Sequence, residues 1–209
     1  MTRLRGRLNT VDPQNLNQII LAEGKNMNKT VVSSAAETKI LAEMIVFTAL
    51  ANALYLISKF YLPFLHLPQG GSITLGSMVP LLWFALRRGL RWGVEAGIVY
   101  GFVHILYITS ADIASPTQVI LDYPIAFSML GLAGAFRKYP VAGVGVGILG
   151  RFICHFISGV IFWGQYAWEG WNVITYSLAY NATYLVPEFI ISAIIIFILL
   201  KEKVLNIYL

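Results

Sequence analysis

Long apolar runs are the feature that most constrains what this chain can fold into. Six of them follow one another, at about 39–62, 73–87, 91–109, 117–136, 140–165 and 176–200. An apolar helix needs about 20 residues to cross a bilayer, so the second run is short and we expect it to be tilted or partly re-entrant. Only 12% of the 209 residues are charged, about half the share of a soluble domain. The sequence therefore predicts an all-α integral membrane protein, whose residues 39–203 form one bundle of six transmembrane helices.

The placement of lysine and arginine predicts how the bundle is oriented. Thirteen of the fifteen lie in four places, which are the stretch up to residue 39, residues 87–91, residues 137–138 and residues 201–203. With six membrane crossings these places share one face, and the positive-inside rule makes that face cytoplasmic. We therefore expect a bacterial plasma-membrane protein with both termini in the cytoplasm. Residues 1–38 are expected to be a polar tail and residues 204–209 a short C-terminal one.

One segment, Arg151 to Asn181, departs from ordinary lipid-facing sequence. Arg151 and His155 stand four residues apart inside an apolar run and so share a helix face, which continues through Gly159 and Trp163. Ionisable side chains at membrane depth are costly and usually mark a functional site. This face is therefore our first candidate site.

Aromatic residues crowd the same segment. Trp163, Trp168 and Trp171 are three of the five tryptophans of the chain and fall within nine residues. Trp and Tyr also collect at membrane–water interfaces, so Trp168 and Trp171 fit an interfacial belt as well as a site. Trp163 lies deeper, on the His155 side, which favours a place in a cavity.

Depth along the predicted helices brings further polar residues to the same level. At 1.5 Å per residue, Asp122 lies roughly 8 Å below the outer end of the fourth helix, and Asn181 lies at a similar depth in the sixth. His155 lies about 15 Å in from Gln165 on the fifth helix. We expect these side chains to meet in the outer half of the bundle, where a ligand from outside would reach them.

Several stretches resemble the thiamine-specific S component of energy-coupling factor (ECF) vitamin transporters. The most specific is HFISGVIFWGQYAWEGWNVITYSLAYN at 155–181, and others are LPQGGSITLGSMVPL at 67–81, LRRGLRWG at 86–93 and LDYPIAFSMLGLAGAFR at 121–137. The resemblance implies a high-affinity thiamine-binding subunit of an ABC importer. This subunit is not expected to be an enzyme or to need a cofactor. Carried over residue by residue, it implies a binding site made of Asp122, Tyr123, Arg151, His155, Gly159, Trp163, Tyr176 and Asn181.

This chain departs from the family pattern in three places. Asp122 stands where a glutamate is common, and Arg151 where a lysine is common. The tryptophan that some relatives carry in the first outer loop is replaced by the sequence QGGS at 69–72. A lid built from this loop would therefore lack that tryptophan.

The sequence contains no Walker A glycine loop and no paired carboxylates spaced for ion coupling. Either partner proteins therefore supply the energy for uptake, or transport is passive. The resemblance implies a shared transmembrane coupling protein and two ATPases. Ala49 and Ala53 stand four apart, in a pattern that lets a second helix approach closely, and the resemblance implies that they dock the coupling protein. The alternative is packing of the two alanines inside the bundle.

Thiamine suits the predicted set because its thiazolium carries a fixed positive charge, which a carboxylate neutralises and a tryptophan face attracts. Two alternatives remain at this point: an S component for another vitamin such as riboflavin, and an intramembrane hydrolase that uses His155, Asp122 and a serine. Within residues 1–26, the stretches at 12–17 and 18–25 back-translate into strings that resemble the thiamine pyrophosphate riboswitch. Our hypothesis is that all of residues 1–26 are translated leader RNA and that Met27 is the true start.

Four other residues have simpler interpretations. Glu95 follows Arg91 by four residues, which predicts a juxtamembrane ion pair. Glu188 follows Pro187 and either joins the site or satisfies a backbone gap or a partner. His104 has no neighbours at metal-ligand spacing and is expected to be a satisfied core histidine, and Cys154 an inert apolar residue.

Overall fold

The computed structural model describes residues 13–202, with side chains for residue 32 and for residues 34–202. Its main helices are α2 (Pro13–Tyr61), α3 (Val79–Arg88), α4 (Leu90–His104), α5 (Pro116–Ile120), α6 (Ala126–Ser128), α7 (Pro140–Phe162) and α8 (Val173–Lys201). A π-helical turn, η5 (Leu121–Ile125), joins α5 to α6, and the 3-10 helix η6 (Met129–Phe136) continues α6. Shorter 3-10 turns lie at η1 (Pro63–Leu65), η2 (Pro68–Gly70), η3 (Ile105–Tyr107), η4 (Ser110–Asp112) and η7 (Gly164–Tyr166).

The prediction of an all-helical membrane protein is confirmed. Among residues 13–202, four helical stretches are long and apolar enough to cross a membrane, namely Ser34–Tyr61, Pro116–Phe136, Pro140–Phe162 and Val173–Lys201. The remaining two predicted runs form α3, with 10 residues, and α4, with 15 residues, so both are shorter than such a span. The count of six membrane crossings and the cytoplasmic position of the termini remain predictions.

The chain divides into two compact units, residues 1–43 and 44–209. The described part of the first unit is helical from Pro13 onwards, because α2 begins there. The first twelve residues of the expected N-terminal tail and the expected C-terminal tail at 204–209 lie outside the described residues. The leader hypothesis and the start at Met27 therefore stay predictions.

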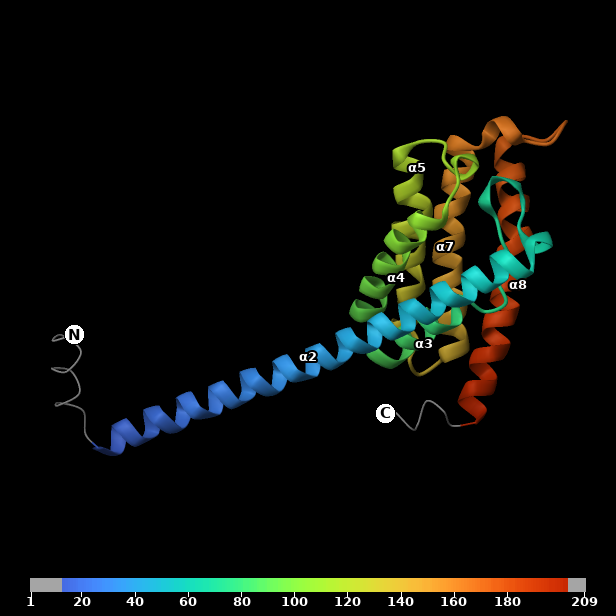
Figure 1. Ribbon diagram of the computed structural model, residues 1–209. Helices are drawn as coiled ribbons and strands as arrows, with labels where there is room; N and C mark the ends of the chain where they lie inside the picture. Colours follow the sequence, from blue (N-terminus) through green and yellow to red (C-terminus); the bar gives the residue numbers. More distant parts are fainter. Residues whose placement is uncertain (1–12, 203–209) are drawn as a thin grey trace. The chain divides into compact units, whose positions relative to one another are not determined.

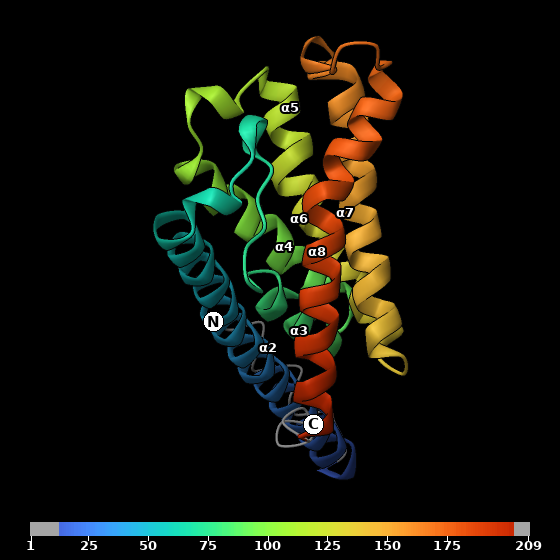
Figure 2. The same cartoon turned by 90° about the vertical axis from the view of Figure 1, so that its right-hand side faces the viewer.

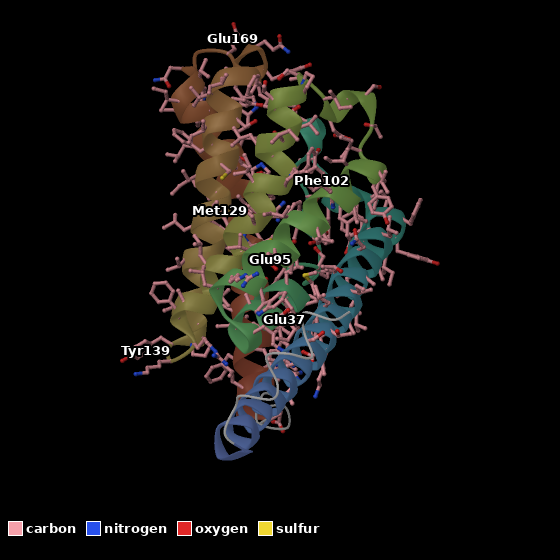
Figure 3. All side chains as sticks on the ribbon, turned by 90° about the vertical axis from the view of Figure 1, so that its left-hand side faces the viewer. Glu37, Glu95, Phe102, Met129, Tyr139 and Glu169 are labelled. Atoms are coloured by element: carbon pink, nitrogen blue, oxygen red, sulfur yellow. The ribbon has the colours of Figure 1, made fainter. Side chains whose placement is uncertain are left out.

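Within the second unit, α7 and α8 lie side by side along their length (Figure 1). Figure 2 shows the irregular segment 62–78 running beside α8 on the side away from α7. The connection from α7 to α8 carries Glu169, at the end of the bundle opposite Tyr139 (Figure 3). Trp163 and Tyr176, which flank this connection, line the cavity described below.

The stretch Pro116–Phe136 changes helix type at the point that matters for the site. Pro124 has no backbone N–H to donate to the preceding turn, and the chain accommodates it in the π-helical turn η5. Asp122 and Tyr123 lie in this turn and face the same cavity.

Glycines on α4 bring it against this turn. A Cβ added to Gly97 would lie 2.3 Å from the carbonyl oxygen of Phe127, and one added to Gly101 would lie 2.6 Å from the Cα of Pro124. Small residues allow this kind of close backbone packing between membrane helices, where the lipid provides little hydrophobic drive for association.

We predict that Gly97→Ala destabilises the protein by about 2 kcal/mol, since the added methyl group overlaps backbone that cannot move aside alone. Gly145→Ala on α7 is the matched control, because its Cβ would meet only the Phe189 ring, at 3.5 Å. The measurement is the thermal unfolding midpoint of each variant in detergent. Equal midpoints for the two variants would show that α4 does not need this close contact.

Candidate functional site

All eight residues of the predicted site line one cavity in the second unit: Asp122, Tyr123, Arg151, His155, Gly159, Trp163, Tyr176 and Asn181. The space between these walls is about 780 Å³, with the open solvent at its mouth included. They come from α2, the segment 69–77, α4, η4, the stretch 118–127, α7 and α8. The structure thus brings the predicted residues together around one cavity.

The carboxylate of Asp122 is the polar centre of the cavity wall, and the side chain is only 7% exposed. Its Oδ2 accepts hydrogen bonds from Gln118 Nε2 at 2.6 Å and from Ser158 Oγ at 2.8 Å. Its Oδ1 lies 3.1 Å from His155 Nδ1. Three donors therefore fix the orientation of a buried negative charge.

Arg151 decides the protonation pattern of His155. The Nε of Arg151 donates to Nε2 of His155 at 3.1 Å, so this imidazole nitrogen is the acceptor. The proton then lies on Nδ1, which donates to Asp122. The guanidinium of Arg151 also lies over the ring of Phe127, 4.1 Å from its centroid. A cation, a neutral imidazole and a carboxylate thus form a continuous chain.

The α8 wall is held by a second hydrogen-bonded group. Tyr184 donates to Asn181 Oδ1 at 2.6 Å, and Asn181 Nδ2 donates to the carbonyl oxygen of Ser177 at 2.8 Å. Gly159 allows α7 to approach here, because a Cβ on it would lie 2.2 Å from Ser177 Oγ. Tyr176, one turn before Tyr180, is buried at the same wall.

Trp163 ends α7 and is 9% exposed, as expected for a tryptophan that lines a cavity. Its ring lies 5.8 Å from that of Tyr166. Trp168 and Trp171, by contrast, are 45% and 46% exposed and do not line the cavity.

His104 differs from its prediction as a satisfied core histidine. It is buried, but its Nδ1 has no hydrogen-bond partner among the described residues, and the side chain lines the cavity. Its ring stacks on Tyr123 with centroids 5.5 Å apart and packs against Tyr55 at 4.1 Å. The sequence could not show this, because these two partners come from different elements, η5 and α2.

The loop at 67–72 covers one side of the cavity. Gln69 and Gly70 have φ angles of 61° and 85°, which turn the chain sharply. Tyr180 on α8 holds the loop: its hydroxyl donates to the carbonyl oxygen of Pro68 and accepts from the N–H of Gly71. Nearby, burial lowers the pKa of His66, which keeps its imidazole neutral at pH 7.

Sequence reasoning did not identify three contributors to the site, which are Gln118, Ser158 and Tyr180. It assigned a fourth, His104, to the core. Gln118 stands four residues before Asp122 and Ser158 three residues after His155, so helical spacing could have indicated both. Tyr180 stands one residue before Asn181, and only the fold shows that it reaches the loop.

Glu188 is fully buried, although it does not line the cavity. Its Oε1 accepts a hydrogen bond from the hydroxyl of Thr74 at 2.7 Å and another from the backbone N–H of Thr74. Glu188 therefore anchors the segment that leads into α3, rather than filling the gap left by Pro187. The predicted ion pair of Arg91 with Glu95 is confirmed, at 3.0 Å, and Cys154 is a buried free thiol.

The arrangement of Ser158, His155 and Asp122 is not that of a hydrolase. Ser158 donates directly to Asp122, and both imidazole nitrogens of His155 are engaged by Asp122 and Arg151. The serine therefore lacks the contact with a histidine base that nucleophilic catalysis requires. Fold and site together define a multi-pass membrane protein with an internal cavity lined by polar and aromatic side chains.

Comparison with known proteins identifies the family. Residues 41–207 match the family model described as thiamine transporter protein (Thia_YuaJ), so the chain belongs to this family, which is one of transporters and not of enzymes. The thiamine transporter ThiT of Bacillus subtilis is 38% identical over 175 residues, which are 76% of this chain and 88% of the relative. ThiT of Lacticaseibacillus paracasei is 32% identical over 167 residues, covering 71% and 82%. A solved structure of ThiT from Listeria monocytogenes superposes with a TM-score of 0.69 at 31% identity, covering 80% of this chain and 96% of that one.

We predict that Glu188→Leu lowers the free energy of unfolding by about 2 to 3 kcal/mol, because it leaves the buried donors of Thr74 unpaired. Glu188→Gln is the matched control, since its amide oxygen can accept the same two hydrogen bonds. The measurement is the thermal midpoint of both variants in detergent. A Gln variant as unstable as the Leu variant would show that the charge matters, and not the acceptor.

Proposed function

We propose that this protein is the thiamine-binding S component of an ECF-type ABC importer, which captures thiamine from outside the cell for ATP-driven uptake. The observation that carries the proposal is the buried, oriented carboxylate of Asp122 in a cavity with aromatic walls, found in a chain of the thiamine transporter family. The ligand residues proposed are Asp122, Tyr123, Arg151, His155, Gly159, Trp163, Tyr176 and Asn181.

The charge of thiamine matches the cavity. Asp122 supplies a negative charge against the thiazolium, and the rings of Trp163, Tyr176 and Tyr123 supply faces that attract a cation, worth about 2 kcal/mol when water is excluded. Arg151 is drawn into the chain of contacts with His155 and lies over Phe127, so its charge is held within the wall. A neutral vitamin such as riboflavin would gain nothing from the negative charge of Asp122.

The aminopyrimidine of thiamine offers hydrogen-bond donors and acceptors and a flat ring. Asn181 and the tyrosine hydroxyls provide polar partners for it, and the rings of His155 and Trp163 provide surfaces for stacking. One half of the ligand is thus recognised by charge and the other by shape and hydrogen bonding.

We predict that Asp122→Asn weakens thiamine binding by about 30-fold or more, because it keeps the shape of the side chain and removes its charge. Binding of the uncharged pyrimidine half of thiamine should change by less than about threefold. Isothermal titration with both ligands makes the measurement. Ser158→Ala, which removes one hydrogen bond to Asp122 but leaves its charge, is the control. Equal losses for both ligands would assign Asp122 a structural role.

Energy coupling is proposed to come from a transmembrane coupling protein and two ATPases that dock on α2. Ala49 and Ala53 are both exposed and lie one turn apart on this helix. Their exposure argues against the alternative of packing inside the bundle. A partner helix could therefore approach the α2 backbone closely at this point. The proposed orientation places both termini in the cytoplasm, beside the ATPases.

We predict that Ala49→Trp or Ala53→Trp leaves thiamine binding by the isolated protein within about twofold of wild type and abolishes ATP-driven uptake by the assembled complex. The bulky ring blocks a partner helix but meets no neighbour in the isolated protein, since both positions are exposed. The measurements are titration of the purified protein and uptake into proteoliposomes. Leu50→Trp is the control, because Leu50 is also exposed on α2 but already carries a large side chain. Normal uptake by both alanine variants would move the docking surface elsewhere.

A further inference from the structure

A ladder of aromatic rings leads from the α7–α8 connection to the centre of the cavity. The ring of Trp168 lies 5.4 Å from that of Tyr176, which lies 5.8 Å from Tyr180. Tyr180 lies 5.9 Å from Tyr184, whose ring lies 6.1 Å from His155. The three tyrosines are spaced by four residues on α8 and therefore share one helix face.

A second hollow lies at the outer end of this ladder. It is lined by residues 67–69 on one side and by Tyr166, Trp168, Tyr176, Tyr180 and Thr183 on the other. Gln69, Tyr176 and Tyr180 also line the main cavity, so the two spaces share a wall. Trp168 is 45% exposed, which makes its ring accessible before a ligand reaches the buried residues.

The chemistry of the hollow suits an organic cation. Half of the described residues that line it are aromatic, and none of these lining residues is a lysine, arginine or histidine. Aromatic faces attract cations, most strongly for tryptophan. The neighbouring Glu169 is exposed at the same end of the bundle (Figure 3) and adds a negative charge there.

Tyr180 stands between the hollow and the main cavity. It lines both spaces, and its hydroxyl is hydrogen-bonded to Pro68 and Gly71 on the facing loop. The loop fits tightly against it, because a Cβ on Gly71 would lie 2.7 Å from the Tyr180 oxygen. A ligand that passes from the hollow into the cavity between Tyr180 and the loop breaks these two hydrogen bonds.

We propose that the hollow is an encounter site, in which Trp168 holds the thiamine cation before it passes Tyr180 into the main cavity. The inference rests on the proposed function and adds to it a second, outer binding site for the same ligand. Binding then takes place in two steps: rapid capture in the hollow, followed by slower transfer past the hydrogen-bonded Tyr180.

Two-step binding has a kinetic signature that the equilibrium affinity does not share. The observed rate rises with thiamine concentration and then saturates, and the half-saturating concentration reports the affinity of the hollow. The equilibrium affinity depends on the final complex in the main cavity, which Trp168 does not line. The two quantities can therefore be changed separately.

The test is stopped-flow measurement of intrinsic tryptophan fluorescence on mixing the purified full-length protein with thiamine. Trp168→Leu keeps an apolar side chain and removes the aromatic face, so we expect the half-saturating concentration to rise about tenfold. The equilibrium dissociation constant, from titration, should change by less than about twofold. Trp168→Phe should recover most of the wild-type half-saturation.

Trp171→Leu is the matched control. Trp171 lies in the same connection, is 46% exposed and contacts Trp168, but it does not line the hollow. Its half-saturating concentration should stay within about twofold of wild type.

Tyr180→Phe keeps the ring and removes both hydrogen bonds to the loop, so we expect the saturating rate and the dissociation rate both to rise several-fold.

Three results would overturn the inference while leaving the proposed function intact. The first is an observed rate for the wild type that rises linearly with thiamine concentration and never saturates. The second is an equal effect of Trp168→Leu and Trp171→Leu, as expected of an interfacial belt. The third is a loss of equilibrium affinity in Trp168→Leu as large as the rise in its half-saturating concentration. A wild-type protein that binds no thiamine at equilibrium would overturn the proposed function and the inference together.

Discussion

A buried carboxylate sets the requirement around which the second unit is arranged. An ionised Asp122 inside a membrane bundle is tolerated only where donors replace the water that it has lost. Gln118 provides one donor from the same helical stretch, and Ser158 and His155 provide two from α7. Satisfying this one charge therefore fixes the stretch 116–136 against α7 and orients the polar side of the cavity.

Close backbone packing makes these contacts possible. Lipid offers little hydrophobic drive for helix association, so van der Waals contact between backbones has to contribute. Gly101 lets α4 approach the π-helical turn that carries Asp122, and Gly97 lets it approach α6. Gly159 lets α7 approach α8 beside Asn181 and itself lines the cavity.

Polar contacts with α8 hold the irregular segment 62–78 in place. Tyr180 binds the loop that covers the cavity, and Glu188, two turns further along, binds Thr74. The two anchors differ in exposure, since Glu188 is fully buried whereas Tyr180 adjoins the outer hollow. The anchor at Thr74 is therefore buried, whereas the hydrogen bond to Pro68 is exposed.

The sequence by itself determined the membrane class, the helical character and one face of the site, because both hydrophobic length and the spacing of Arg151, His155, Gly159 and Trp163 are local properties of one helix. Depth along the predicted helices added Asp122 and Asn181, and family resemblance added Tyr123 and Tyr176. The structure places all four around the same cavity. Only the tertiary structure decided that His155 and Ser158 on α7 satisfy Asp122, that His104 lines the cavity with an Nδ1 that has no partner among the described residues, and that Tyr180 and Glu188 hold the segment 62–78. These contacts join residues from different elements, up to 114 positions apart in the chain, and helical periodicity carries no information about such pairs.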